Sequence, residues 1–207
     1  LLYQGGCTER MGSVAAGTTV SDYKPEEIKR HSSVCTATGS IQLDGLKVNL
    51  LDTPGMFDFA GGMIQGISAA DCVMITVSGK SGVRVGTKKA YRAAAGKPRM
   101  FVVTKLDDEN ANFYNVLTDL KSTFGPSVCP VVVPVIVDRK VDCYINLIEM
   151  KAYRYDADGK AQEIPMPTSE VSEKLSYRVD GLIQAFSEAI AETDETLFEK
   201  FFSGEEF

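Results

Sequence analysis

The chain has 207 residues, of which 44% are hydrophobic and 24% are charged, and its formal net charge is −6. This length suits one large domain, or one domain with an inserted lobe, and it is ample for a hydrophobic core. The acidic balance excludes a general coating role on DNA or RNA, which needs a basic face, and no apolar run is long enough to span a membrane.

The five cysteines are odd in number, are widely spaced and form no C-x-x-C pair. This pattern favours free thiols in a reducing cytosol over a disulfide framework or a zinc site. We therefore expect a cytoplasmic protein.

In chain order, the first predicted element is LLYQGG, which is typical of the last turn of a helix that two glycines end. This start predicts that the chain is a piece of a longer protein. The polar stretch from Thr8 to Thr38 is expected to be mostly loop, with one helical turn near Pro25. A hairpin around Asp44-Gly45 follows, and its second strand runs into DTPG.

The middle of the chain alternates buried strands with helices. Strands are predicted over Cys72–Val77 and Met100–Val103, and helices over Gly61–Ala70, Thr87–Ala95 and Asn110–Phe124. A further strand, VCPVVVPVIV, carries prolines that indicate either a strand end or a sheet edge. The alternation predicts an α/β fold with a mostly parallel sheet.

The character of the sequence changes near Asp138. The run VDCYINLIEMKAYRY followed by DADGK predicts a strand pair around a turn, and Ser172–Phe202 predicts one or two helices. We therefore expect a core over residues 1–137 and an attached lobe over residues 138–207.

Two polar motifs, DTPG and TKLD, follow predicted strands at the ends where α/β sheets hold ligands. An Asp after a strand can hold a Mg²⁺-bound water, and the N–H of a following Gly can meet a terminal phosphate. A carboxylate at the end of TKLD can accept two hydrogen bonds from guanine, which selects GTP over ATP. Either motif alone is weak, but the two in this order favour a nucleotide site. The residues are Asp52, Thr53, Pro54 and Gly55 in the first motif and Thr104, Lys105, Leu106 and Asp107 in the second.

Between these motifs, Ser78–Ser81 reads SGKS and contains the tail of a phosphate-binding loop. The complete pattern needs a glycine five positions before Gly79, where Met74 stands in a predicted strand. We interpret SGKS as a surface loop. The full G-x-x-x-x-G-K-[ST] pattern is absent from the sequence, and we expect it, with the first core strand, just upstream of Leu1.

Together these motifs resemble the GTP-binding domain of bacterial elongation factor G, above all its elongation factor G-like paralogues, with the tetracycline-resistance ribosomal-protection proteins as cousins. The resemblance runs through RMGSVAAGTTVSDYKPEEIKR, NLLDTPGMFDF, SGVRVGT, TKLDDENANF, LIEMKAYRY and AETDETLFEKFFSGEE. It implies a Ras-like P-loop GTPase core with an inserted α+β lobe at 138–207. It also implies GTP or GDP and Mg²⁺ as ligands and the ribosome as partner, with no membrane or DNA binding.

The resemblance assigns nucleotide contacts to residues 52–55 and 104–107, with Thr104 where the family usually has Asn. The first switch of the family usually reads R-G-I-T, with the Thr hydroxyl on Mg²⁺. Here the four residues are RHSS, so the resemblance passes the metal role to Ser33. Asp52 is the second expected metal ligand. Met56 stands where the family has a His that orients the attacking water, and a thioether is a poor substitute.

Two functions stay open at this point. The first is a translational GTPase that acts on the ribosome and hydrolyses GTP to GDP and phosphate in the intact protein. The second is a hydrolysis-deficient, GTP-binding, ribosome-associated regulatory module. An ATP-dependent enzyme of another class is a further alternative that Asp107 disfavours. Because the phosphate loop is expected upstream, this chain by itself is expected to be inactive.

Overall fold

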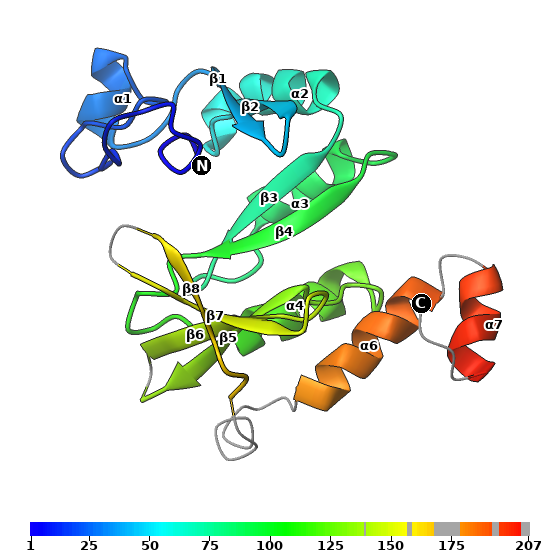
Figure 1. The fold of residues 1–207 in the computed structure, drawn as a ribbon. Helices are drawn as coiled ribbons and strands as arrows, with labels where there is room; N and C mark the ends of the chain where they lie inside the picture. Colours follow the sequence, from blue (N-terminus) through cyan, green and yellow to red (C-terminus); the bar gives the residue numbers. More distant parts are fainter. Residues whose placement is uncertain (139, 157–158, 168–178, 192–194, 204–207) are drawn as a thin grey trace. The chain divides into compact units, whose positions relative to one another are not determined.

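The computed structural model describes residues 1–138, 140–156, 159–167, 179–191 and 195–203 (Figure 1). None of the helices among these residues is long and apolar enough to cross a membrane. The chain divides into two compact units: unit 1 is Leu1–Thr76 with Arg84–Val102, and unit 2 is Val77–Val83 with Val103–Phe207. The sequence division into 1–137 and 138–207 concerns the organisation of the family and stays a prediction.

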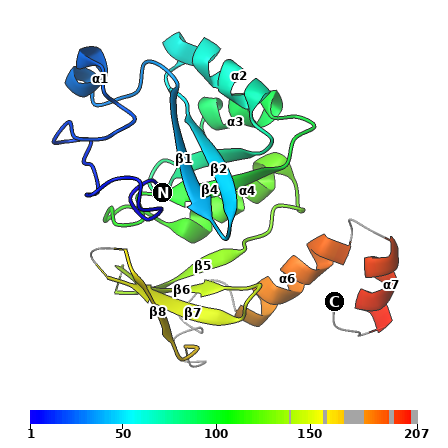
Figure 2. The same cartoon turned by 45° about the horizontal axis from the view of Figure 1, so that its top comes forward.

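Unit 1 contains a hairpin and several short helices. Its β1 and β2 pair antiparallel through a turn in which both Asp44 and Gly45 have positive φ, as a type I′ hairpin turn requires. Figure 2 shows these two strands side by side. The hairpin and the helices predicted over residues 61–70 and 87–95 are confirmed. The elements are α1 (Pro25–Arg30), β1 (Ala37–Leu43), β2 (Leu46–Asp52), the 3-10 helix η1 (Phe57–Phe59), α2 (Ala60–Ala69) and α3 (Val85–Ala93).

Strands β3 (Val73–Ser78) and β4 (Arg99–Thr104) form a two-stranded sheet. They run parallel, because the hydrogen-bonded partners at the two ends of the pair rise together in residue number on both strands. Val73 N–H donates to Pro98 O at 2.9 Å, and Gly79 N–H donates to Thr104 O at 2.7 Å. The connection between them contains α3, as a parallel pair requires.

Unit 2 contains α4 and a four-stranded antiparallel sheet in the order β5-β6-β7-β8. In the described part of the chain, β5 is therefore an edge strand of this sheet, which is one of the two positions that its prolines indicate. The helices predicted over residues 172–202 correspond to α6 and α7, but residues 172–178 and 192–194 lie outside the described part. The elements are α4 (Phe113–Phe124), β5 (Val132–Val137), β6 (Lys140–Asn146), β7 (Lys151–Tyr155), β8 (Ala161–Ile164), α6 (Val179–Ala191) and α7 (Glu195–Ser203).

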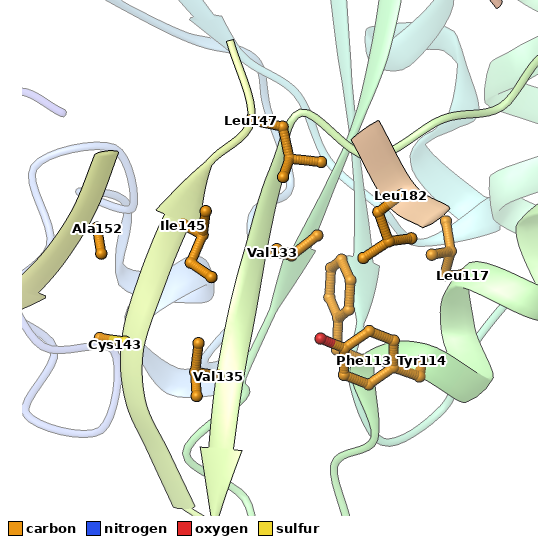
Figure 3. Packing of buried hydrophobic residues seen from close by; sticks show 10 residues of the cluster. All are labelled: Phe113, Tyr114, Leu117, Val133, Val135, Cys143, Ile145, Leu147, Ala152 and Leu182. Carbon is orange, nitrogen blue, oxygen red and sulfur yellow. The ribbon is translucent and has the colours of Figure 1, made fainter. Parts of the chain in front are cut away.

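The hydrophobic core of unit 2 lies where α4 and α6 meet the sheet (Figure 3). Helix α4 begins at Asn112, whose side chain accepts a hydrogen bond from Asn115 N–H at 3.0 Å. Tyr114 of this helix is buried, and its hydroxyl donates to Pro134 O on β5 at 2.9 Å. The buried members of the core cluster are Phe113, Tyr114, Leu117, Val133, Val135, Cys143, Ile145, Leu147, Ala152 and Leu182.

The prediction of a mostly parallel core sheet is met only in part by the described residues. Within the predicted core, β3 and β4 form a parallel pair, and β1 and β2 form the antiparallel hairpin that the sequence predicts. The sequence did not predict that β5 pairs antiparallel with β6 of the predicted lobe. Two residues separate β5 from β6, whereas a parallel pair needs a crossover of about a dozen residues or more.

Candidate functional site

The DTPG motif lies in unit 1, directly at the end of β2. Asp52 is the last residue of the strand and is exposed, and no hydrogen bond or ion pair engages its carboxylate among the described residues. Pro54 is buried, whereas the space beside Gly55 is open. The motif therefore offers an accessible carboxylate and a glycine backbone that a ligand can approach closely.

Helix α2 supports this motif through two glycines one helical turn apart. A Cβ on Gly62 would lie 3.1 Å from both Pro54 Cγ and Thr36 Oγ1, and a Cβ on Gly66 would overlap Thr53 Cγ2. The Thr36 hydroxyl also donates to Gly62 O at 3.2 Å. Sequence reasoning missed this contact, and the available signal was the four-residue spacing of glycines in GMIQG.

The segment that contains Ser33 is tied to α1 by the carboxylate of Glu27, which is only 1% exposed. This carboxylate accepts hydrogen bonds from the N–H groups of Lys24, Val34 and Cys35 at 3.1, 2.9 and 3.0 Å. The bonds, led by that from Cys35, hold the pKa of Glu27 below its ordinary value although burial opposes them. Glu27 gave no signal in the sequence beyond its place in a helical turn.

The hydroxyl of Ser33 donates to Asp22 Oδ1 at 2.7 Å. Asp22 is buried, and the Thr19 hydroxyl donates to its other oxygen at 3.4 Å. No hydrogen bond joins Ser33 to Asp52 within the described residues, which also contain no cluster of three or more His, Cys, Asp or Glu able to hold a metal ion. Since a hydroxyl keeps its lone pairs when it donates a proton, Ser33 can still act as a metal ligand. A site with so few protein ligands suits Mg²⁺, which usually retains several waters.

Met56 lies between the DTPG motif and η1 and is 43% exposed. Its sulfur accepts a hydrogen bond from Ser32 Oγ at 3.7 Å. The predicted first switch therefore touches the residue that directly follows DTPG. A thioether accepts weakly and donates nothing, so Met56 lacks the means by which an imidazole orients water.

The TKLD motif follows β4 and lies in unit 2. Thr104 ends the strand, whereas Lys105 and Asp107 are exposed. Lys105 has a φ of 57°, a left-handed conformation that costs a residue with a Cβ about 1–2 kcal/mol. No hydrogen bond engages the Asp107 carboxylate in the part of the chain that the structure describes. Both of its oxygens therefore remain available to a base edge.

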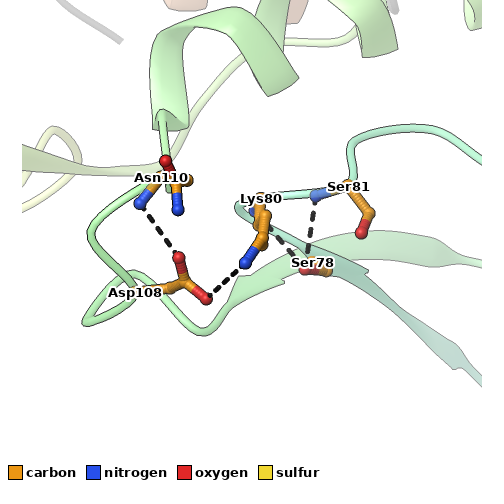
Figure 4. A network of polar contacts seen from close by, with 5 residues as sticks. All are labelled: Ser78, Lys80, Ser81, Asp108 and Asn110. Carbon is orange, nitrogen blue, oxygen red and sulfur yellow. Dashed lines mark hydrogen bonds and ion pairs between the residues drawn. The ribbon is translucent and has the colours of Figure 1, made fainter.

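The SGKS loop, defined as Ser78–Ser81, lies beside the TKLD motif, because Gly79 N–H donates to Thr104 O. Figure 4 shows the contact of the loop with Asp108, the residue after the motif. Lys80 Nζ lies 3.3 Å from Asp108 Oδ2, and Asp108 Oδ1 accepts from Asn110 N–H at 2.9 Å. The hydrogen bond from Asn110, and then the contact with Lys80, lower the pKa of Asp108. The prediction of a surface loop is correct for Lys80 and Ser81 but wrong for Gly79, which is buried.

The predicted site residues thus fall into two groups in different units. The structure brings Ser32 of the first switch to Met56, and it brings the SGKS loop to TKLD. Sequence reasoning missed four supporting residues. These are Asp22, Glu27, Gly66 and Gly79.

Comparisons with known proteins agree with the sequence motifs. The family described as Elongation factor Tu GTP binding domain matches residues 1–197. Proteins named "Elongation factor G-like protein" from Mycobacterium tuberculosis and Thermotoga maritima are 37% and 33% identical over 99% and 100% of this chain. The chain spans 28% of the length of each of these relatives. A Thermus thermophilus protein of known crystal structure is 41% identical in sequence to this chain, and the two structures superpose with a TM-score of 0.88. The match covers all of this chain and 30% of the Thermus thermophilus chain.

Proposed function

Because the chain belongs to the elongation factor Tu GTP-binding domain family, we propose that it forms most of the GTP-binding domain of an elongation factor G-like translational GTPase. The relatives at 33% and 37% identity that carry that name support the proposal. The full-length protein binds GTP in the cytoplasm, acts on the ribosome and hydrolyses GTP to GDP and phosphate.

The observation that carries the proposal is the exposure of Asp52 and Asp107 at the ends of two strands, each within a family motif. Strand ends are where α/β proteins hold nucleotides. Asp107 accepts the ring N–H and the amino group of guanine, and the apolar stem of Lys105 covers the base. The backbone of Gly55 is open to a terminal phosphate.

Asp52 and Ser33 are the proposed metal ligands. Their carboxylate and hydroxyl oxygens are of the kind that Mg²⁺ prefers. When bound, the ion neutralises the charge that develops on the terminal phosphates. Asp22 accepts the hydrogen bond that the Ser33 hydroxyl donates, which leaves the lone pairs of the hydroxyl oxygen for the ion.

The thioether of Met56, which contacts Ser32, is the observation behind a second candidate function. Orienting the attacking water is a main contribution of the protein to this chemistry, and Met56 cannot make it. The alternative is a hydrolysis-deficient, GTP-binding regulatory module that associates with the ribosome.

Single-turnover GTP hydrolysis by the full-length protein, with and without ribosomes, separates the two functions. The comparison variant is Met56→His, which introduces an imidazole at the residue after DTPG. Ribosome-stimulated turnover by the unmodified protein supports the GTPase and eliminates the regulatory module. Tight GTP binding without turnover, with turnover gained in Met56→His, supports the module instead.

Nucleotide class is tested by competition. We expect GDP to displace labelled GTP and ATP to leave it bound, because adenine lacks the donor pair that Asp107 recognises. Displacement by ATP at the same concentration as GDP would show that the assignment of TKLD to guanine is wrong.

A further inference from the structure

The SGKS loop takes no part in the proposed nucleotide contacts, yet it joins both ends of the segment that carries Asp107. Gly79 N–H donates to Thr104 O at 2.7 Å, and Gly79 O accepts from Asn112 N–H at 3.0 Å. Thr104 opens the TKLD motif, and Asn112 caps helix α4. One buried residue thus bonds to the chain on either side of Asp107.

A side chain at Gly79 would be crowded by three neighbours. A Cβ there would lie 2.8 Å from Leu106 Cδ2, 3.1 Å from Thr104 O and 3.2 Å from Ala111 Cβ. Leu106 has little room to withdraw, because it packs against the hydrophobic cluster of unit 2. Gly79 is not among the glycines with positive φ, so close approach, and not backbone conformation, favours a glycine here.

The SGKS loop is itself held in place. Ser78 Oγ accepts hydrogen bonds from the N–H groups of Lys80 and Ser81 at 3.3 and 3.4 Å (Figure 4). Gly82 N–H donates to Ser78 O at 2.9 Å, and a Cβ on Gly82 would lie 2.8 Å from Asp119 Oδ2 of α4. The ion pair from Lys80 to Asp108 adds little, since solvent screens exposed pairs. The loop is therefore a fixed surface against which TKLD packs.

We propose that Gly79 is a positioning residue for guanine selection. It acts through Leu106, whose side chain occupies the space that a Cβ would take, and so it sets the place of the next residue, Asp107. The same contact supports the left-handed turn at Lys105, a conformation that persists only where the surroundings hold it. The inference rests on the proposed function, because it presumes that Asp107 recognises guanine.

The test compares the affinities of the full-length protein for GDP and for inosine diphosphate, which lacks the 2-amino group that Asp107 accepts from. In Gly79→Ala we expect the preference for GDP to fall by about tenfold or more, the worth of one hydrogen bond to a carboxylate. The matched control is Gly86→Ala, because the space beside Gly86 is open, and it should keep the preference. A purely structural role would weaken both nucleotides equally.

A second variant distinguishes a specific effect of the Leu106 contact from misfolding of Gly79→Ala. In Gly79→Ala/Leu106→Val the clashing Cδ2 is removed, so part of the GDP preference should return. A Gly79→Ala protein that keeps its preference, or that loses both affinities in parallel, overturns the proposal, as does a double variant that recovers none of it.

If the unmodified protein does not prefer GDP, the proposed function fails and the positioning claim is tested separately by amide hydrogen exchange. Faster exchange at residues 105–108 in Gly79→Ala than in Gly86→Ala supports the claim. Equal exchange overturns it.

Discussion

The methyl group of Thr53 fills the space beside Gly66 that a side chain on α2 would need. Thr53 belongs to the DTPG motif, and one turn earlier in the helix a Cβ on Gly62 would contact Pro54 of the same motif. The helix backbone therefore packs directly on the motif.

This packing predicts an unusual response to alanine in a helix. Glycine to alanine normally stabilises a helix by about 1 kcal/mol, but Gly66→Ala should lower the free energy of unfolding by about 1–3 kcal/mol through overpacking against Thr53. Gly61→Ala is the control, because it lies on the same helix with open space beside it. Chemical denaturation measures both, and stabilisation by both substitutions would contradict the contact.

Because the buried carboxylate of Glu27 holds the chain that follows the RHSS segment, we expect its replacement to lower the free energy of unfolding. Glu27→Gln places an amide NH₂ among backbone N–H donors and should cost about 1–3 kcal/mol at neutral pH. Glu26→Gln, on the exposed face of the same helix, should cost almost nothing. Equal effects of the two substitutions in thermal or chemical unfolding would argue against the anchoring role.

The lowered pKa of Glu27 adds a pH dependence to this effect. A carboxyl whose pKa is lower in the folded state stabilises the fold above its unfolded-state pKa, which is about 4.3. That contribution is lost as the pH falls through the folded-state value. The stability difference between the unmodified protein and Glu27→Gln should therefore narrow below about pH 4. A stability difference between the two proteins that does not change with pH would contradict the lowered pKa of Glu27.

For Tyr114 in unit 2 we expect the opposite dependence of stability on pH, because burial raises the pKa of its phenol to about 12. The neutral phenol is favoured in the fold, so its contribution is present below the unfolded-state pKa of about 10 and is lost as the pH rises through the folded value. Tyr114→Phe should cost about 0.5–1.5 kcal/mol at neutral pH through loss of the bond to Pro134. Unfolding free energies measured up to pH 11 should fall less steeply for the variant, and parallel curves would contradict the assignment.

The elements with strong periodicity were predictable from the sequence. The apolar spacing on α4 and the continuous apolar run of β3 each report on one local segment, and the structure places both within a few residues of the prediction. The antiparallel pairing of β5 with β6 was not predicted, because alternation of strand and helix says nothing about the short connection between these two strands.

The candidate site was predictable only where a motif marks it. DTPG and TKLD lie at strand ends as predicted, and the roles of their residues stay predictions. The packing roles of Gly66 and Gly79 were not predicted, because a glycine that admits a neighbour is hard to tell in the sequence from a glycine that permits a turn. Asp22 and Glu27 escaped notice because single acidic residues in a polar stretch have no periodic signal.

The most direct measurement of guanine recognition is the affinity of the full-length protein for GDP and for xanthosine diphosphate, before and after Asp107→Asn. Xanthine carries a carbonyl where guanine carries its 2-amino group. The NH₂ of an Asn amide can donate a hydrogen bond to that carbonyl, but in guanine it would face the 2-amino group, which is also a donor. We predict that Asp107→Asn loses about tenfold or more in GDP affinity and gains affinity for xanthosine diphosphate. A variant that binds GDP as tightly as the unmodified protein would contradict the assignment of Asp107 to the base, and with it the central claim.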